Sequence, residues 1–291
     1  MKKHSGTILL VLIFFVGLAV MLYPTISDYI NQRNQTRVVN SYAQQVDGLS
    51  DADYTAYFDA ADVFNQEIAA DPDALYHADH FSTYSTTLDV TGTGIMGYVT
   101  IPRIKVKLPV YHGTSDGVLQ IAAGHLAGTS LPVGGATTHA VVSGHTGLPS
   151  ARLLTGLDEL KKGDTFAFHV LDQTYTYKVD QISVVLPSEI SKLNIESGAD
   201  YATLITCTPY GVNSHRLLVR GHRIPNPKVP DKTQYDEPGE MTAVAAAVIG
   251  LLVFVAGCAF VGLARLWRRS WIVRHGLCAG AGARHSSGVR G

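Results

Sequence analysis

Hydrophobic residues along this chain form two long apolar runs near the ends, with a shorter-period pattern between them. The first run covers residues 7–23, about seventeen positions, which is just enough for a helix to cross a bilayer. The second run, residues 243–266, is longer and carries no charge before Arg265. A basic start before an apolar stretch also fits a cleaved signal peptide, but no small-x-small cleavage site follows the first run. We therefore expect an uncleaved membrane anchor there.

The charges beside the two runs predict how the chain is oriented in a membrane. Basic residues lie before the first run and after the second: Lys2, Lys3, Arg265, Arg268, Arg269 and Arg274. Lysine and arginine are retained on the cytoplasmic side of membrane spans. We therefore expect a multi-pass protein of the cell membrane, with both termini cytoplasmic and the region between the spans outside.

Helical spacing follows the first apolar run. Apolar residues recur every three or four positions through residues 38–49 and again through residues 54–68, which predicts two helices. Either Ser50 or Asp51 can cap the second helix. These helices are expected to pack on the following domain or to form a stalk above the membrane.

From residue 94 the pattern becomes that of β-strands. Seven segments are rich in β-branched or alternating apolar residues, with glycine, proline and aspartate turns between them: 95–102, 104–110, 139–143, 165–171, 175–186, 202–206 and 216–224. Seven or eight short strands with few helices predict a small closed barrel or a sandwich.

Charge and histidine spacing narrow the possible partners. The 23 Lys and Arg residues nearly balance the 24 Asp and Glu residues, and no basic block lies outside the membrane flanks. This composition argues against nucleic acid as a partner. The histidines are not paired with cysteines or carboxylates at the spacing of metal ligands. No metal and no other cofactor is expected.

Cys207 is the one cysteine of three that is expected outside the membrane, because Cys258 and Cys278 lie in or beyond the second apolar run. A single thiol in an oxidising compartment has no disulfide partner within its own domain. Free cysteine is often a small buried hydrophobe. The alternative interpretation is that Cys207 is a nucleophile.

A cysteine nucleophile requires a base or cation for its thiolate and a donor for the developing oxyanion. His145 follows a predicted strand and is flanked by Gly144 and Gly147, while Arg216 opens the strand that comes after Cys207. Taken alone, the cysteine is consistent with a core position. The histidine is consistent with an ordinary surface residue, and the arginine with a solvent-exposed residue on a strand. Spacing by itself does not establish a catalytic triad.

Several motifs resemble those of a known family. The run Thr203-Leu204-Ile205-Thr206-Cys207 matches the TLxTC signature of sortases, the transpeptidases of Gram-positive cell surfaces. Other segments resemble the class C, pilin-polymerising branch in the family's order: 96–102, 108–115, 124–132, 143–149 and 207–221. Together they cover about residues 94–225, most of the outer domain.

The resemblance implies a mainly β fold: an eight-stranded sortase-type β-barrel with N-terminal helices, flanked by two transmembrane helices. It places the family's catalytic residues at Cys207, His145 and Arg216. The implied reaction is cleavage of an LPxTG-like sorting signal between Thr and Gly through a thioacyl intermediate. The acyl group is then transferred to a lysine amine of a pilin subunit, which polymerises pili.

Class C sortases often carry a lid with an Asp-Pro-aromatic tip over the cysteine. Asp71 and Pro72 lie in the corresponding region, but Asp73 stands where the aromatic residue is expected. The alternative is that Asp71-Pro72 only ends the second helix, because proline disfavours helix continuation. The 187–200 segment is expected either to wall the substrate groove, as in relatives, or to be a plain surface connection.

These expectations define six regions of the chain. They are a membrane anchor (1–26), a helical stalk with the candidate lid (27–90), the catalytic barrel (91–226), a linker (227–240), a C-terminal transmembrane helix (241–267) and a cytoplasmic tail (268–291). Three other functions stay open. They are a housekeeping sortase that anchors proteins to peptidoglycan, a membrane-anchored cysteine protease, and a non-enzymatic adhesion or receptor module with Cys207 in its core.

Overall fold

The computed structural model describes residues 2–228 and, beyond them, only residues 250, 253, 256, 257 and 262. The chain divides into two compact units, Met1–Pro238 and Gly239–Gly291. Apart from those five residues, the predicted second span (241–267) and tail (268–291) lie outside the described residues. The same holds for the predicted linker beyond residue 228.

The first helix, α1 (Lys2–Val46), is continuous and contains Pro24. It therefore runs without a break across the expected boundary between anchor and stalk at residue 26. Its early apolar side chains are exposed, whereas Val39, Tyr42 and Val46 are buried near its other end. In the described part of the chain, α1 is the one helix that is long and apolar enough to cross a membrane.

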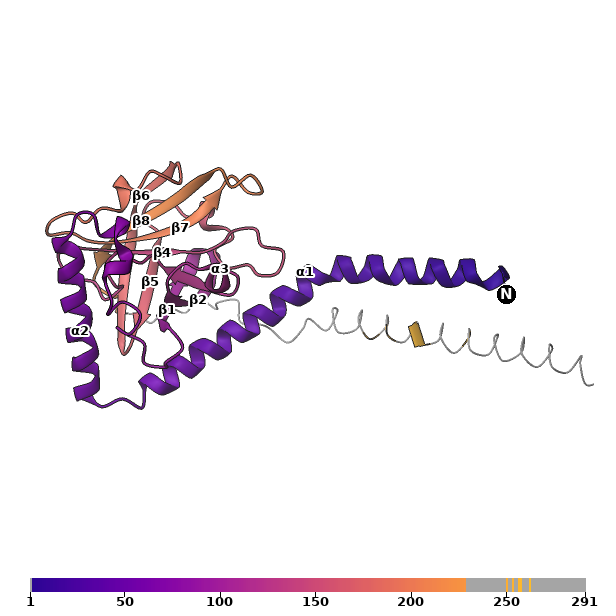
Figure 1. Cartoon of the computed structure of the whole chain (residues 1–291), viewed down its shortest axis with the longest axis horizontal. Coiled ribbons are helices and arrows are strands. Elements are labelled where there is room, and N and C mark those ends of the chain that lie inside the picture. The colour runs from indigo at the N-terminus through magenta and orange to yellow at the C-terminus, as the bar shows by residue number, and fades with distance from the viewer. Residues whose placement is uncertain (1, 229–249, 251–252, 254–255, 258–261, 263–291) are drawn as a thin grey trace, which may run out of the picture. The chain divides into compact units, whose positions relative to one another are not determined.

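The second helix, α2 (Asp51–Ala70), begins at Ser50, one of the two caps expected from the sequence. The Ser50 hydroxyl accepts a hydrogen bond from the Asp53 N–H, and the Asp53 carboxylate accepts one from the Ser50 N–H, which forms a capping box. Phe64 and Ile68 on one face of α2 are buried in the main core. Both predicted helices thus pack on the barrel domain, α2 beside its flank (Figure 1).

Eight strands form a closed barrel in the order β1-β2-β3-β4-β7-β8-β6-β5. The strands are β1 (Ile95–Ile101), β2 (Val106–His112), β3 (Ala123–His125), β4 (Thr138–Ser143), β5 (Thr165–Val170), β6 (Gln173–Val185), β7 (Asp200–Thr208) and β8 (His215–Ile224). Between them lie one short helix, α3 (Asp116–Leu119), and three 3-10 turns, Pro102–Ile104, Leu157–Glu159 and Ser191–Leu193; two more turns, Ala74–Tyr76 and Ala78–His80, precede the barrel. The predicted eight-stranded fold is confirmed.

Strand β3 is the element that the sequence pattern did not single out. It has only three residues, Ala123, Gly124 and His125, so it offers no apolar alternation to recognise. It pairs in parallel with β2 and antiparallel with β4. A side chain at Gly124 would meet the Gly113 carbonyl oxygen at 2.2 Å, so the close approach of these two backbones requires glycine.

Two apolar clusters lie on opposite faces of the strands that carry the candidate site. Inward residues such as Val142, Leu204 and Leu217 belong to the main core. Alternate residues on the outer face form a second cluster, here called the outer apolar patch: Val141, Val185, Leu193, Ile205 and Leu218. Because strand side chains alternate between faces, the patch shows which positions of β4, β7 and β8 point outward.

Candidate active site

Cys207 and Arg216 are direct partners across the antiparallel pair of β7 and β8. Each lies two positions along its strand from a residue of the outer apolar patch, Ile205 on β7 and Leu218 on β8. The period of two places both side chains on the outer face of the barrel, at the end of the patch. Both residues are partly exposed.

His145 comes to the same place through β4, which runs parallel to β7 with Ser143 opposite Ile205. The pairing continues beyond the strand end, because the Gly144 N–H donates to the Ile205 carbonyl at 3.0 Å. The Thr206 hydroxyl also donates to the Gly144 carbonyl at 2.9 Å. In this register the next residue, His145, lies beside Cys207.

The turn that carries His145 depends on glycine at two positions. A side chain at Gly144 would meet two carbons of Leu154 at 2.8 Å. Gly147 has φ +72°, and a side chain there would meet the Tyr210 ring at 2.4 Å. The turn after β4 therefore lies directly against the loop that follows Cys207, which holds the histidine and cysteine segments together.

The hydrogen bonds of the other barrel histidines separate them from His145. His125 and His139 are buried, and both ring nitrogens of each are hydrogen-bonded. His112 contacts two backbone carbonyl oxygens. Within residues 2–228, His145 is partly exposed and its ring has no hydrogen bond or ion pair to the protein. Its nitrogens are open to a substrate.

The three arginines of β8 differ in their partners. Arg220 contacts the carboxylates of Asp180 and Glu196, and Arg223 lies 4.0 Å from a carboxylate oxygen of Asp200. The Arg216 Nη1 donates instead to the backbone carbonyls of Asn213 and His215, at 3.2 and 3.1 Å. In the described region Arg216 has no carboxylate partner, so its positive charge is not neutralised beside Cys207.

A cavity of about 280 Å³ opens beside Cys207 at the end of the barrel. Its walls come from the segment after His145, the loop after Cys207 and the start of the 3-10 turn at Leu157–Glu159: Thr146, Arg152, Thr155, Gly156, Asp158, Glu159, Thr206, Thr208, Tyr210 and Leu217. Cys207 thus borders this cavity, which leaves room beside the sulfur for an acyl group.

The candidate lid residues lie at the far end of the outer face. Asp71 caps the end of α2, and its carboxylate accepts a hydrogen bond from the Asp73 N–H at 2.9 Å. Asp71 and Pro72 line a cavity of about 400 Å³ whose other lining residues include His139 and Leu193. Leu75, just beyond them, packs against the outer apolar patch. The role of Asp71, Pro72 and Asp73 as a lid stays a prediction.

Comparison with known proteins agrees with this architecture. Residues 99–224 match the model of the sortase domain. The chain is 46% identical to sortase C1 from Streptococcus agalactiae, with a TM-score of 0.61, covering 66% of this chain and 100% of that one. The chain belongs to the sortase family. Sortases are cysteine transpeptidases, so the predicted class of enzyme is confirmed.

The chain is also similar to two further members of the family, one a sortase C and one a sortase A. A sortase C of Streptococcus pneumoniae is 45% identical over 65% of this chain and 97% of its own, with a TM-score of 0.59. A sortase A of Streptococcus agalactiae (serotype III, strain NEM316) is 30% identical over 117 residues, which are 39% of this chain and 47% of that protein. The alignment thus spans about half of this curated relative. The solved sortase C structures support the class C resemblance seen in the sequence.

The sequence did not predict which side chains line the Cys207 cavity. Most of them, Tyr210 among them, come from loops, where no periodicity marks a functional position. Arg220 has a weak signal, because it shares the alternate spacing of Arg216 and Leu218 on β8. That spacing places it on the same outer face, where it contacts carboxylates from two other segments.

Proposed function

We propose that this sortase is a class C enzyme that joins pilin subunits through their LPxTG-like sorting signals. The observation that carries the proposal is the pairing of Cys207 with Arg216 across β7 and β8, with His145 beside them from β4. It is also supported by the likeness to a Streptococcus pneumoniae sortase C described for its pilin substrate specificity.

In the first half of the reaction the Cys207 sulfur attacks the threonine carbonyl of the sorting signal. A tetrahedral oxyanion forms, and the Arg216 guanidinium stabilises its charge or holds the substrate backbone. The Thr–Gly carbon–nitrogen bond then breaks, and His145 donates a proton to the departing glycine amine. A thioacyl-enzyme remains, with the threonine carbonyl bonded to sulfur.

In the second half a lysine amine of another pilin subunit attacks the thioester carbon. His145 accepts the proton that this amine loses, the carbon–sulfur bond breaks, and Cys207 leaves. The product is an amide between two subunits. Because each half needs a different protonation state of His145, the histidine returns to its starting state after one turnover.

The apolar residues of the sorting signal bind beside the outer apolar patch in this proposal. Ile205 and Leu218 form the cross-strand pair two residues along from Cys207 and Arg216. Ile190, from the loop between β6 and β7, packs against the same patch. The patch residues are themselves buried, so leucine and proline bound beside the half-buried Ile190 at the border of the patch would direct the following threonine towards the sulfur. This gives the 187–200 segment the role of a groove wall.

Membrane anchoring is part of the proposal. The exposed apolar side chains of α1 and its length suit a bilayer span. With the second span predicted at 241–267, both termini lie in the cytoplasm and the barrel lies outside, where pilin subunits are exported. Reporter fusions at each terminus test the topology, and an extracellular signal from either one contradicts it.

The second candidate is a housekeeping sortase, favoured by the likeness to a sortase A of Streptococcus agalactiae. The two functions differ in the acceptor amine: a pilin lysine in one, a cell-wall cross-bridge peptide in the other. The site residues are the same in both.

The acceptor is tested with the full-length protein in detergent and a sorting-signal peptide. Three reactions are compared by mass spectrometry: no amine, a lysine-bearing pilin domain, and a cross-bridge peptide. We expect the pilin adduct, and no product from Cys207→Ala. Preference for the cross-bridge peptide indicates the housekeeping function, hydrolysis in every reaction indicates a protease, and activity in Cys207→Ala excludes this nucleophile.

A further inference from the structure

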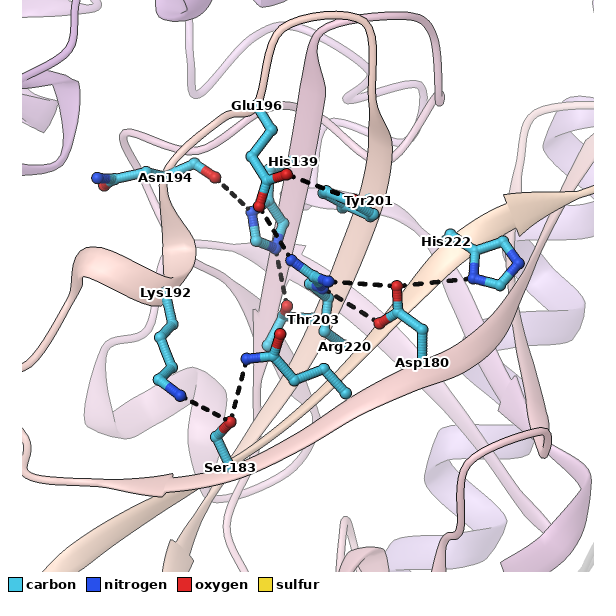
Figure 2. Close-up of polar contacts among 11 residues, drawn as sticks. His139, Asp180, Ser183, Lys192, Asn194, Glu196, Tyr201, Thr203, Arg220 and His222 are labelled. Atoms are coloured by element: carbon cyan, nitrogen blue, oxygen red, sulfur yellow. Dashed lines mark hydrogen bonds and ion pairs between the residues drawn. The ribbon is translucent and has the colours of Figure 1, made fainter.

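A network of charged and polar side chains lies on the outer face of the barrel, beneath the 186–199 loop that connects β6 to β7 (Figure 2). Arg220 is at its centre. The Nε and Nη2 groups of Arg220 donate to the two carboxylate oxygens of Asp180, at 3.1 and 3.3 Å. Its Nη1 donates to a carboxylate oxygen of Glu196 at 3.1 Å.

The two carboxylates come from different parts of the molecule. Asp180 belongs to β6, so its contact with Arg220 joins two neighbouring strands of the barrel. Glu196 belongs to the 186–199 loop, so its contact attaches the loop to β8. The guanidinium also lies 4.0 Å from the centre of the Tyr201 ring, and the Tyr201 hydroxyl donates to Glu196 at 3.4 Å.

His139 attaches the same loop at a second point (Figure 2). Its Nδ1–H donates to the Asn194 carbonyl at 2.9 Å, and its Nε2 accepts from the Thr203 hydroxyl at 2.8 Å. Burial lowers the pKa of this imidazole and keeps it neutral, while the Asn194 carbonyl, which can only accept, fixes the tautomer. Asn194 and Glu196 are two residues apart, so both attachments act on one short stretch of the loop.

The attached stretch is continuous with the apolar part of the loop. Leu193 belongs to the outer apolar patch and Ile190 packs against it. Along β8 the residues on the outer face are, in order, Arg220, Leu218 and Arg216, each two residues from the next. The network therefore lies at one end of the patch and the Cys207 site at the other, with the loop's apolar residues above the middle.

We propose that Arg220 is a positioning residue for the sorting signal, because it holds the 186–199 loop in place over the apolar patch. With the loop attached, Leu193 stays buried against the patch, and the half-buried Ile190 is held as a fixed wall that receives the apolar residues of the signal. Arg220 contacts neither the thiol nor the scissile bond. Its loss weakens substrate binding and leaves the chemical steps unchanged. This inference rests on the proposed function only for the identity of the substrate.

The guanidinium is required because one group makes three directed contacts and a stacking contact. A lysine ammonium at position 220 cannot bind both oxygens of Asp180, reach Glu196 and lie flat on Tyr201 at the same time. The Arg220 side chain is 18% exposed and that of Glu196 is 59% exposed. Glu196→Gln therefore removes the charge of this ion pair and weakens the loop attachment without burying an unpaired charge.

The experiment compares Glu196→Gln, Arg220→Lys and their double variant in the full-length protein. Glu189→Gln is the matched control, because Glu189 lies in the same loop but hydrogen-bonds only to Ser191. Two readouts are used: KM and kcat for a sorting-signal peptide, and amide hydrogen exchange of residues 186–199. The second readout needs no substrate, so it tests the attachment even if the enzyme does not act on that peptide.

We expect Glu196→Gln to raise KM by about threefold, with kcat within about twofold of wild type, and to speed exchange in the loop. The double variant is expected to be no worse than Arg220→Lys, since both changes break one interaction. Glu189→Gln should match wild type in both readouts. Unchanged loop exchange in both Glu196→Gln and Arg220→Lys overturns the inference, as does a fall in kcat with unchanged KM. An inactive wild type with normal loop exchange overturns the proposed substrate alone.

Discussion

Cys207 and Arg216 face each other across β7 and β8, while the next outward pair on the same strands, Ile205 and Leu218, is apolar. A thiol and a guanidinium thus lie at the edge of the buried outer apolar patch. The guanidinium has no carboxylate partner in the described part of the chain, so a positive charge is in place beside the sulfur before a substrate arrives. Register alone brings the two residues together, without any help from loop structure.

Arg216→Lys tests whether the planar guanidinium matters at this pair. We expect a loss of about 100-fold in kcat/KM, because a lysine ammonium cannot offer two directed donors to an oxyanion and to the loop carbonyls. Steady-state kinetics with a sorting-signal peptide measure the effect. Arg223→Lys, on the same strand but beside Asp200, is the control and should keep most of the activity. Equal rates for Arg216→Lys and wild type would remove Arg216 from the catalytic residues.

His145→Asn tests the proton transfers. General acid–base catalysis by a side chain contributes about 10²–10⁴-fold, and we expect kcat to fall within that range. His215→Asn is the matched control: His215 precedes Arg216 on β8, and within residues 2–228 its ring hydrogen-bonds only to the Ser214 hydroxyl. Single-turnover formation of the thioacyl-enzyme separates chemistry from release. Similar losses in both variants would mean that the effect is structural.

Deletion of Asp71–Asp73 tests the candidate lid. If the segment covers the outer face, its removal should speed the reaction of Cys207 with a thiol reagent by about threefold or more, because accessibility controls thiol reactivity. The structure gives a route for this effect, since Leu75 packs on the apolar patch and Gly128 contacts the backbone of Ala74 and Leu75. An unchanged rate would support the plain helix end.

The barrel could be predicted from the sequence because most of its strands carry their own signal. Alternating apolar residues predicted β1 and β2, and a motif that ends in Cys207 identified the β7 edge. β3 could not be found in this way, since its three residues are held by backbone pairing with β2 and β4. Residue 26 is not an element boundary, because one helix continues through Pro24 from the apolar run to the barrel.

The catalytic candidates and the loop network differ in how far the sequence reveals them. Cys207, His145 and Arg216 were named from motifs that resemble a family, and the strand register places them together. No motif in the sequence marks Arg220. Its partners Asp180 and Glu196 lie 40 and 24 residues away in the chain, and only the pairing of β6 with β8 and the return of the loop bring them together.

The buried histidines predict how stability depends on pH. His125 is buried, its Nε2–H donates to the Ser130 carbonyl, and its Nδ1 accepts from the Tyr84 hydroxyl. Burial, with a smaller effect of the nearby His112, lowers the pKa of His125 to about 4. Burial also lowers the pKa of His139.

Because the unfolded chain protonates His125 near pH 6.5 and the folded chain only near pH 4, the unfolded state binds more protons between these values. Stability is therefore fully present above about pH 6.5, falls as the pH decreases, and levels off below about pH 4 for this group. His125 alone accounts for a loss of about 3 kcal/mol over that interval. Burial raises the pKa of Asp200, which acts in the opposite direction.

The contribution of His125 is isolated by comparing urea unfolding of wild type and His125→Gln from pH 4 to pH 7.5. The glutamine variant is expected to be less stable at pH 7.5 but to lose less stability on acidification. His80→Gln, at an exposed position, is the control and should follow wild type. Parallel curves for wild type and His125→Gln would show that His125 is not held neutral in the fold.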